Sequence, residues 1–475
     1  MLTDALETRC GCVLGGAGPA GMGLLFNALK NGTLAELARE GLIIVDSSPT
    51  PGAGCLGEYR ITANSVGDVF LDCLRDPALR EIFEPLEGAL SYWRIRHQAE
   101  SAPQLADVGQ LLAEASALVL EHIVKHFGVT LWHSSTIIQV VSGNDEYEVW
   151  IEREGHVHSV RCRTLILNLG GRQDPQQLLD SLADQGLYVP PSTTILGADL
   201  LLRMNSVQLR EQFADALASG QGITLVGGSH SAFSMLENLA DALEFAGLKQ
   251  VNLVHRSPVR LFYESVEEAR QVGYVFDPQE DVCPVSGRVN RSGGLRYRAL
   301  DVGRAVLAHG RVGNTGVRVR LLQTQGVSPE AKALAQQALT DSALVVQCTG
   351  YQPRLPPLNR IDGSIISLRE ITGGLDSDPG GCPLDENGQR LHGLHLFGLG
   401  AGLGVDPLLG SEPSFDGRIY GVWQFHHHAS GAVIEAVLTR LQPKPKETST
   451  PAPNLVERLE NGLPFLFPGF AGIKT

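Results

Sequence analysis

The chain has 475 residues, more than one ordinary hydrophobic core accommodates, so we expect about three units or two domains with insertions. Acidic residues outnumber basic ones by 52 to 38, and the resulting net charge of −14 argues against a nucleic-acid or anionic-membrane partner. Glycine accounts for 54 residues, a share above the roughly 7% usual in globular proteins. Because the glycines follow no collagen-like period, this excess predicts many tight turns.

Targeting and redox signals point to one compartment. No apolar run approaches the length of about 18 residues that a membrane-spanning helix needs. The first residues show neither a basic nor an apolar signal region, so we expect no secretory signal. The eight cysteines are scattered, and Cys12, Cys73 and Cys348 lie in or beside apolar runs, as buried thiols do. We therefore expect a cytoplasmic protein without a disulfide framework.

The chain begins with a predicted strand, a glycine-rich turn, a helix and a second strand. These elements span residues 10–14, 15–21, 22–30 and 42–45. Continuous apolar strands separated by helices indicate a parallel sheet covered on both faces. The next predicted elements are a long helix at 107–127 and strands at 130–132, 147–152 and 164–169.

A second strand–turn–helix–strand unit follows later in the chain. Its elements span residues 223–226, 227–231, 232–246 and 251–254. Further strands are predicted at 344–347 and 394–397, and a single helix at 421–441. A Pro/Lys/Thr-rich linker occupies 442–453, and beyond it we expect a short helix from Leu455 and a docking segment at 463–470. The two similar units predict two sheets of the same kind.

The first glycine-rich turn has the pattern G-x-G-x-x-G. Its residues are Gly16, Ala17, Gly18, Pro19, Ala20 and Gly21. In such a turn the glycines permit a tight bend, close approach to a pyrophosphate and close packing of helix on strand. The following helix N-terminus offers free N–H groups to phosphate. Asp46 ends the next strand and is suited to bind ribose hydroxyls, with Ser47 beside it, so the unit predicts a dinucleotide site.

The second turn departs from this pattern but keeps its small residues. It reads Gly227, Gly228, Ser229, His230 and Ser231, followed by Ala232. The strand after it ends in Arg256 rather than in an acid. Arginine can pair with a 2′-phosphate that an acid would repel, which favours NADPH over NADH.

Three other chemistries compete with this interpretation. Ser229 and Ser231 resemble part of a hydrolase nucleophile elbow, but the final glycine of that motif is missing. A disulfide reductase needs two neighbouring cysteines, and Cys55 has no partner four or five residues on. His122 and His126 lie one helical turn apart and could bind a metal, although a surface pair without a third ligand is the simpler interpretation.

Two dinucleotide units in one chain suggest a flavin reduced by a nicotinamide, and three further stretches resemble one family. These are Cys348-Thr349-Gly350-Tyr351 with Pro356, Gly402-Leu403-Gly404-Val405-Asp406-Pro407-Leu408-Leu409, and Phe70-Leu71-Asp72-Cys73-Leu74-Arg75-Asp76-Pro77. The sequence resembles flavoproteins with paired FAD and NADPH domains, nearest to the N-hydroxylating flavin monooxygenases. The resemblance implies that the Gly402–Leu409 segment lies near the flavin.

The resemblance also implies an activity. It implies an FAD-containing, NADPH- and O2-dependent monooxygenase that N-hydroxylates a small amine or amino-acid-like metabolite through a C4a-hydroperoxyflavin. Further predicted cofactor-binding residues are Gly170, Thr349, Gly350, Tyr351, Gly398, Gly400 and Leu409. Asp406, Glu412 and Arg418 are candidates for the catalytic site, where each could hold a substrate or serve as a cap or ion pair.

The predicted fold is α/β with two Rossmann-like dinucleotide-binding domains. We expect an NADPH domain at 190–353, inserted into an FAD domain formed by 1–189 and 354–441, with a separate segment at 442–475. Two alternatives stay open: an NADPH-linked flavin oxidoreductase or dehydrogenase that inserts no oxygen, and a non-catalytic FAD-binding partner subunit. Oligomeric state is open as well, because the 463–470 segment could cover its own chain or a neighbour in a homo-oligomer.

Overall fold

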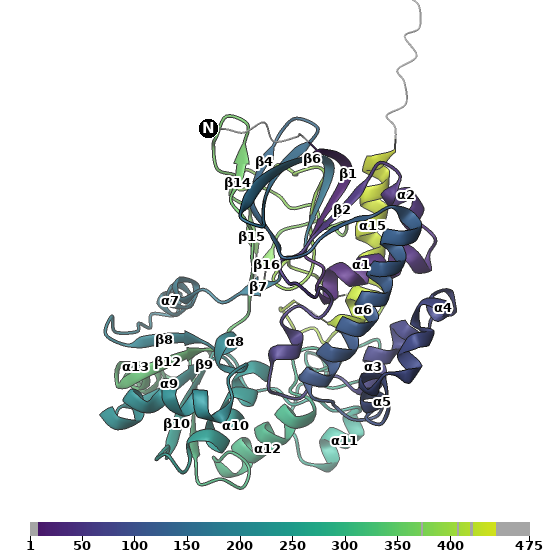
Figure 1. Cartoon of the computed structure of the whole chain (residues 1–475). Helices are drawn as coiled ribbons and strands as arrows, with labels where there is room; N and C mark the ends of the chain where they lie inside the picture. The colour runs from purple at the N-terminus through teal and green to yellow at the C-terminus, as the bar shows by residue number, and fades with distance from the viewer. Residues whose placement is uncertain (1–7, 372–373, 406–407, 419–420, 443–475) are drawn as a thin grey trace, which may run out of the picture. The chain divides into compact units, whose positions relative to one another are not determined.

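The chain folds around two sheets, each covered by helices. A computed structural model describes residues 8–371, 374–405, 408–418 and 421–442 (Figure 1). The helix predicted from Leu455 and the docking segment predicted at 463–470 lie outside these residues. No helix in the described ranges is both long and apolar enough to cross a membrane.

The first sheet has eight strands. Seven follow the order β14-β4-β5-β6-β1-β2-β3, and the eighth, β17, pairs with the last residues of β6, beyond the part that pairs with β5. Their bounds are β1 Thr8–Gly15, β2 Leu42–Val45, β3 Thr130–Trp132, β4 Ser135–Ser142, β5 Tyr147–Arg153, β6 His156–Leu167, β14 Leu358–Arg360 and β17 Leu394–Leu396. β1 pairs in parallel with both β2 and β6, so it is central. β6 pairs with β5 along its first half and with β17 at its end.

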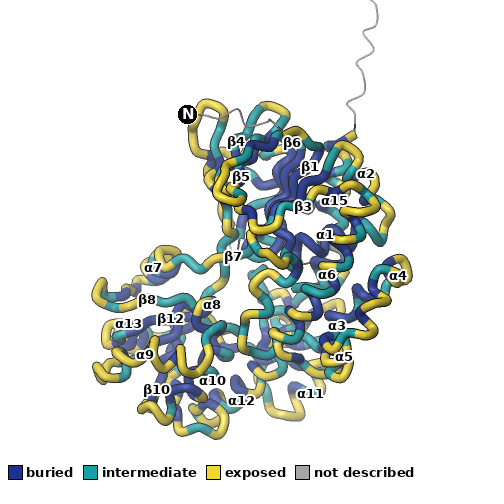
Figure 2. Tube along the Cα trace, in the orientation of Figure 1, coloured by how far each residue is buried: buried dark blue, intermediate teal, exposed yellow. Residues whose placement is uncertain are grey.

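Alternate side chains of β1 enter two different cores. Cys12 and Leu14 pack with the helices α1 (Pro19–Lys30), α6 (Leu105–Phe127) and α15 (His428–Leu441). Val13 points to the other face, where it packs with the β4–β5 layer. Thr8 and Arg9 at the start of β1 are exposed, whereas the strand is buried from Gly11 to Gly15, where it is covered on both faces (Figure 2).

The second sheet contains five parallel strands in the order β11-β10-β9-β12-β8. Their bounds are β8 Thr194–Gly197, β9 Gly222–Val226, β10 Gln250–His255, β11 Arg318–Gln323 and β12 Ser342–Gln347. One face packs on α9 (Ser206–Ser219), α10 (His230–Leu243) and α12 (Tyr297–His309), and the other on α7 (Pro175–Asp184) and α13 (Pro329–Thr340). The predicted α/β class with two Rossmann-like sheets is confirmed.

Short elements complete the described chain. The strands β7 (Gly171–Arg172) and β13 (Gln352–Pro353) pair antiparallel where the chain leaves the first sheet and returns to it. The remaining helices and strands are α2 Leu34–Ala38, α3 Gly67–Leu71, α4 Arg80–Phe83, α5 Leu90–Arg96, α8 Ala198–Leu201, α11 Val266–Gln271, β15 Glu370–Ile371 and β16 Gly374–Leu375. Four 3-10 turns occupy Leu56–Glu58, Asp72–Arg75, Pro77–Leu79 and Glu84–Gly88.

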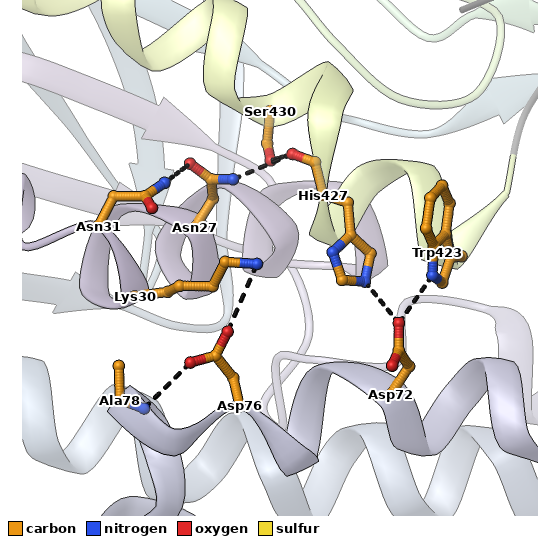
Figure 3. Close-up of polar contacts among 9 residues, drawn as sticks. All are labelled: Asn27, Lys30, Asn31, Asp72, Asp76, Ala78, Trp423, His427 and Ser430. Carbon is orange, nitrogen blue, oxygen red and sulfur yellow. Dashed lines mark hydrogen bonds and ion pairs between the residues drawn. The ribbon is translucent and has the colours of Figure 1, made fainter. Parts of the chain in front are cut away.

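The single helix predicted at 421–441 is wrong, because the chain breaks at His427 into α14 (Val422–His426) and α15. His427 has φ −120° and ψ −112°, which no helix allows. Its carbonyl oxygen accepts hydrogen bonds from Asn27 Nδ2 at 3.0 Å and Ser430 Oγ at 2.9 Å (Figure 3). Asp72 Oδ2 accepts from Trp423 Nε1 at 2.8 Å and lies 3.1 Å from His427 Nε2, so both sides of the break are fixed.

The break presses α14 onto α1. A Cβ at Gly23 of α1 would lie 2.3 Å from the Phe425 carbonyl oxygen, so only glycine permits this approach. His426 is 2% exposed, and its ring packs against that of Phe26 in a tilted arrangement, with 4.9 Å between the ring centroids. Burial, together with the neighbouring His427, lowers the pKa of His426 to about 3.

The cysteines are as the sequence predicts. All eight are free thiols in the structure. Cys12, Cys73 and Cys348 are buried, whereas Cys55 is exposed. Burial raises the pKa of Cys12 and of Cys73 to about 12, which makes these two thiols unreactive.

The His426 environment predicts an acid-sensitive fold. In the unfolded chain His426 takes up a proton near its ordinary pKa of 6.5, whereas the folded chain holds it neutral down to about pH 3. Stability is therefore lost as pH falls through this window, by about 2 kcal/mol at roughly pH 5. His426→Gln should reduce that loss by a similar amount, measured as the difference in urea unfolding free energy between about pH 7 and pH 5.

The exposed His309 at the end of α12 provides the matched control. His426→Gln should change the pH dependence of unfolding more than His309→Gln does. An unchanged slope in His426→Gln would show that this histidine is not held neutral by its surroundings.

Candidate cofactor and substrate site

The first glycine turn joins β1 to α1 by direct backbone packing. Gly16 has φ +86°, and a Cβ there would lie 2.4 Å from the Asn168 carbonyl oxygen. A Cβ at Gly21 would lie 2.0 Å from the Gly16 carbonyl oxygen. Gly18 caps α1 without any side-chain hydrogen bond, and Pro19 occupies the first turn. No side chain caps the α1 N-terminus, which is the arrangement found where a helix N-terminus binds phosphate.

Two polar side chains border this turn. Asp46 accepts hydrogen bonds from Ala17 N at 2.6 Å and from Ser48 N at 2.7 Å, while the adjacent Ser47 is exposed. Burial raises the pKa of Asp46, and the two backbone N–H groups act against that rise. Asn168 follows β6 and is 7% exposed, yet neither its Oδ1 nor its Nδ2 has a partner among the described residues.

Asn168 is a candidate ligand that the sequence analysis missed. An unpaired buried amide is costly, so a polar ligand atom at this point would satisfy it. The available signal was a lone amide at the end of an otherwise apolar strand, one residue before the Leu169–Gly170 turn. An unsatisfied amide, an uncapped helix and bare glycine backbone together fit the pyrophosphate half of a dinucleotide.

The second glycine turn repeats this construction at the end of β9. Gly227 has φ +138°, and a Cβ there would lie 2.6 Å from the Cys348 carbonyl oxygen. Gly228 packs against the side chain of His255. Ser229 precedes α10 without capping it, and Ser231 lies in the first turn of that helix. Both predicted turns therefore lie at the carboxyl ends of parallel strands, where ligands of open α/β sheets bind.

His230 begins α10 as a neutral side chain. Its Nε2 accepts a hydrogen bond from Arg296 N at 3.0 Å. Burial, and then the positive charge of Arg296, lower the pKa of His230 to about 4. Because Nε2 accepts, the ring proton lies on Nδ1 and remains available as a donor.

Arg256 ends β10 on the exposed surface. It forms an ion pair of 3.3 Å with Asp416, in which the side chains are 51% and 69% exposed. An exposed pair of this kind contributes little stability, so Arg256 can exchange it for another anion.

The predicted cofactor-binding residues Thr349, Gly350 and Tyr351 lie beside a network of hydrogen bonds that joins loops of both sheets. The Thr349 carbonyl accepts from Gln173 Nε2 at 3.0 Å, and Gln173 Oε1 accepts from Asp199 N at 2.9 Å. Tyr351 and Tyr59 both direct their hydroxyls to Asp199, and Arg203 pairs with the same carboxylate. Gly350 is exposed.

Three more predicted glycines occupy close or strained positions near these loops. Gly170, Gly398 and Gly400 all have positive φ. A Cβ at Gly400 would lie 2.4 Å from Pro353 N, and one at Gly398 would lie 2.9 Å from the Cβ of Ala20. The end of β17 is thereby held against the first glycine turn.

The segment 408–418, which follows the predicted flavin-proximal motif, is anchored by a buried acid. Glu412 is 1% exposed, and its carboxylate accepts from Gly293 N at 2.7 Å and from Ser292 N at 2.9 Å. This matches the anchoring role that the sequence left open for Glu412. Leu409 is partly buried beside Cys283, and the Arg418 guanidinium lies near Gly404. Asp406, the remaining catalytic candidate, lies outside the described residues.

The histidine pair on α6 does not form a metal site within the described chain. The rings of His122 and His126 contact each other at a tilt, with 4.5 Å between their centroids, and His126 is exposed. Across the described ranges, no three His, Cys, Asp or Glu side chains gather closely enough to hold a metal ion.

Comparison with known proteins gives one curated relative and several similar structures. The CMP-5'-(3-aminopropyl)phosphonate hydroxylase of Streptomyces rubellomurinus is 30% identical over 435 residues, which cover 91% of this chain and 98% of that protein. Ornithine hydroxylase (PvdA) of Pseudomonas aeruginosa has a TM-score of 0.53 at 11% identity, over 92% of this chain and all of its own. Ornithine N-hydroxylase of Kutzneria sp. 744 has a TM-score of 0.52 at 14% identity, and the match covers 91% of this chain and 99% of that protein. No family model matches the chain.

The solved structures share the fold, and the curated relative spans nearly the whole of both chains. The family that the sequence resembles is thus confirmed. The chain belongs to the N-hydroxylating flavin monooxygenases and is an enzyme of that class.

Proposed function

We propose that this enzyme uses FAD, NADPH and O2 to hydroxylate the nitrogen of a small primary amine. The observation that carries the proposal is the pair of uncapped glycine turns, each at the carboxyl end of a parallel strand in its own sheet. One turn suits a flavin dinucleotide and the other suits the nicotinamide dinucleotide that reduces it. Family membership supports the assignment of the reaction.

FAD would be held by the first turn. The α1 N-terminus faces its pyrophosphate, and Asp46 exchanges its bond to Ala17 N for ribose hydroxyls. Asn168 supplies an amide to the same ligand. When bound, FAD supplies the redox and oxygen chemistry, and the chain supplies position and exclusion of water.

NADPH would be held by the second turn. The α10 N-terminus takes the pyrophosphate, the His230 Nδ1 proton can be donated to a phosphate oxygen, and Arg256 takes the 2′-phosphate. The domain limits proposed with this assignment are 190–353 for the NADPH domain, 1–189 and 354–441 for the FAD domain, and 442–475 for the remainder. Thr349, Gly350 and Tyr351 would lie where the two cofactors approach each other.

Oxygen uptake and product analysis test the reaction. With FAD bound, a primary amine should stimulate NADPH oxidation under air and yield a hydroxylamine. Under nitrogen, NADPH should reduce the flavin once and then stop. Continued anaerobic turnover with product formation would instead indicate a dehydrogenase.

The glycine turn gives a direct prediction for FAD binding. Gly21→Ala places a Cβ against the Gly16 carbonyl, which must move and distort the turn. We expect purified Gly21→Ala to lose most of its flavin absorbance per protein. Gly88→Ala is the control, because a Cβ at Gly88 meets no atom within 4 Å. Full FAD content in Gly21→Ala would refute this binding mode.

Arg256 gives a prediction for cofactor choice. Arg256→Ala removes the charge proposed to pair with the 2′-phosphate, and a charge-assisted hydrogen bond of this kind corresponds to about a tenfold rise in the KM for NADPH. The KM for NADH should change little. The exposed Arg210 on α9 is the matched control, and Arg210→Ala should leave both values unchanged. Equal losses for the two nicotinamides would contradict the assignment.

A further inference from the structure

Three arginines, Arg260, Arg291 and Arg296, form a half-buried arginine cluster next to the 408–418 segment. Each donates to a backbone carbonyl: Arg260 Nη1 to Ser414 at 2.9 Å, Arg291 to Gly410, and Arg296 to Arg291. Within the described ranges, none of the three has a carboxylate within ion-pair distance. The hydrogen bonds printed for these guanidinium groups are therefore to carbonyl oxygens, and Arg296 also lies over the ring of Phe262, 4.3 Å from its centroid.

Neighbouring arginines behave differently. Arg298 pairs with Glu237 and Arg203 with Asp199, and these carboxylates raise the pKa of each guanidinium. By contrast, burial lowers the pKa of Arg296, and Arg291 and Arg288 lower it further, against the opposing effects of Tyr297 and Glu264. The Arg291 Nε atom is buried without a partner in the described chain. Desolvated charge without an ion pair is expensive in a fold, which favours a role in binding an anion.

The cluster lies between the second glycine turn and the predicted flavin-proximal segment. Arg296 N donates to His230 at the start of α10, while Arg291 and Arg260 hold the carbonyls of Gly410 and Ser414. Asn290 and Tyr297 flank the cluster with φ +47° each. Left-handed backbone at two non-glycine residues stores strain, and such strain persists where a fixed geometry serves a site.

We propose that the arginine cluster binds a phosphonate or phosphate group of the amine substrate. This inference rests on the proposed N-hydroxylation and names the substrate class. A planar guanidinium matches a tetrahedral anion through paired N–H donors, and each of these guanidinium groups keeps donors beyond its single carbonyl contact. The curated relative, by its name, acts on a nucleotide-linked aminopropylphosphonate. The NADPH phosphates have their own proposed partners in the α10 N-terminus and Arg256.

Binding measurements on the FAD-loaded enzyme with NADP+ present test the site. The probes are 3-aminopropylphosphonate, its CMP conjugate and n-butylamine, which has the amine but no anion. The wild type should bind at least one phosphonate about tenfold more tightly than n-butylamine, and Arg296→Gln and Arg291→Gln should each remove most of that difference. Arg296→Lys should retain part of it.

The matched control is Arg298→Gln, two residues away, where a carboxylate already neutralises the arginine. It should bind the phosphonates as the wild type does. The melting temperature and FAD content of each variant are measured first. A variant with a lower melting temperature or FAD content than the wild type is replaced by Arg260→Gln, because Arg260 donates to the Ser414 carbonyl.

Three results would overturn the proposal. The first is a wild type that does not prefer the phosphonates, and the second is unchanged phosphonate binding in the cluster variants. The third is a loss of NADP+ affinity in these variants as large as their loss of phosphonate affinity, which would assign the cluster to the cofactor. Failure of the proposed function is a separate result, because hydroxylation of any primary amine is scored by product. Phosphonate binding without hydroxylation would retain the site and reject the reaction.

Discussion

Backbone meeting backbone at two glycine turns is the constraint on which the candidate site depends. Gly21 must lie against the Gly16 carbonyl, and Gly227 against the Cys348 carbonyl, at distances that leave no room for a side chain. These contacts bring a helix N-terminus directly to the end of a parallel strand. Each sheet therefore ends at a helix N-terminus that no side chain caps, which is the arrangement that we propose to hold a dinucleotide.

The segment leading back to α1 is held at both ends. Glu412 fastens one end to the Ser292–Gly293 backbone, next to the second sheet. The other end is pinned to α1 by the His427 carbonyl and by the close approach at Gly23. These contacts fix the positions of Glu412 and His427, and fixed positions near the reacting atoms are what an oxygen-transferring site requires.

Local patterns were enough to predict the strands β1, β2, β9 and β10 and the glycine turns between them, because each depends on neighbours close in sequence. The strands β4, β8 and β11 were missed, since their short apolar stretches become strands by pairing with segments distant in sequence. The break at His427 could not be predicted, since its cause is an amide 400 positions away, on Asn27. Asn168 and the arginine cluster were missed for a related reason. An arginine becomes notable only when no carboxylate approaches it, and that depends on which distant segments fold beside it.

Incorporation of isotopically labelled O2 is the most direct test of the central claim, that two dinucleotide cradles in this chain serve oxygen transfer to nitrogen. The FAD-loaded enzyme, NADPH and an amine substrate are mixed under labelled O2, and the product is analysed by mass spectrometry. The account predicts one labelled oxygen atom in the hydroxylamine. A product without label, or oxidation that proceeds equally well without O2, would contradict it.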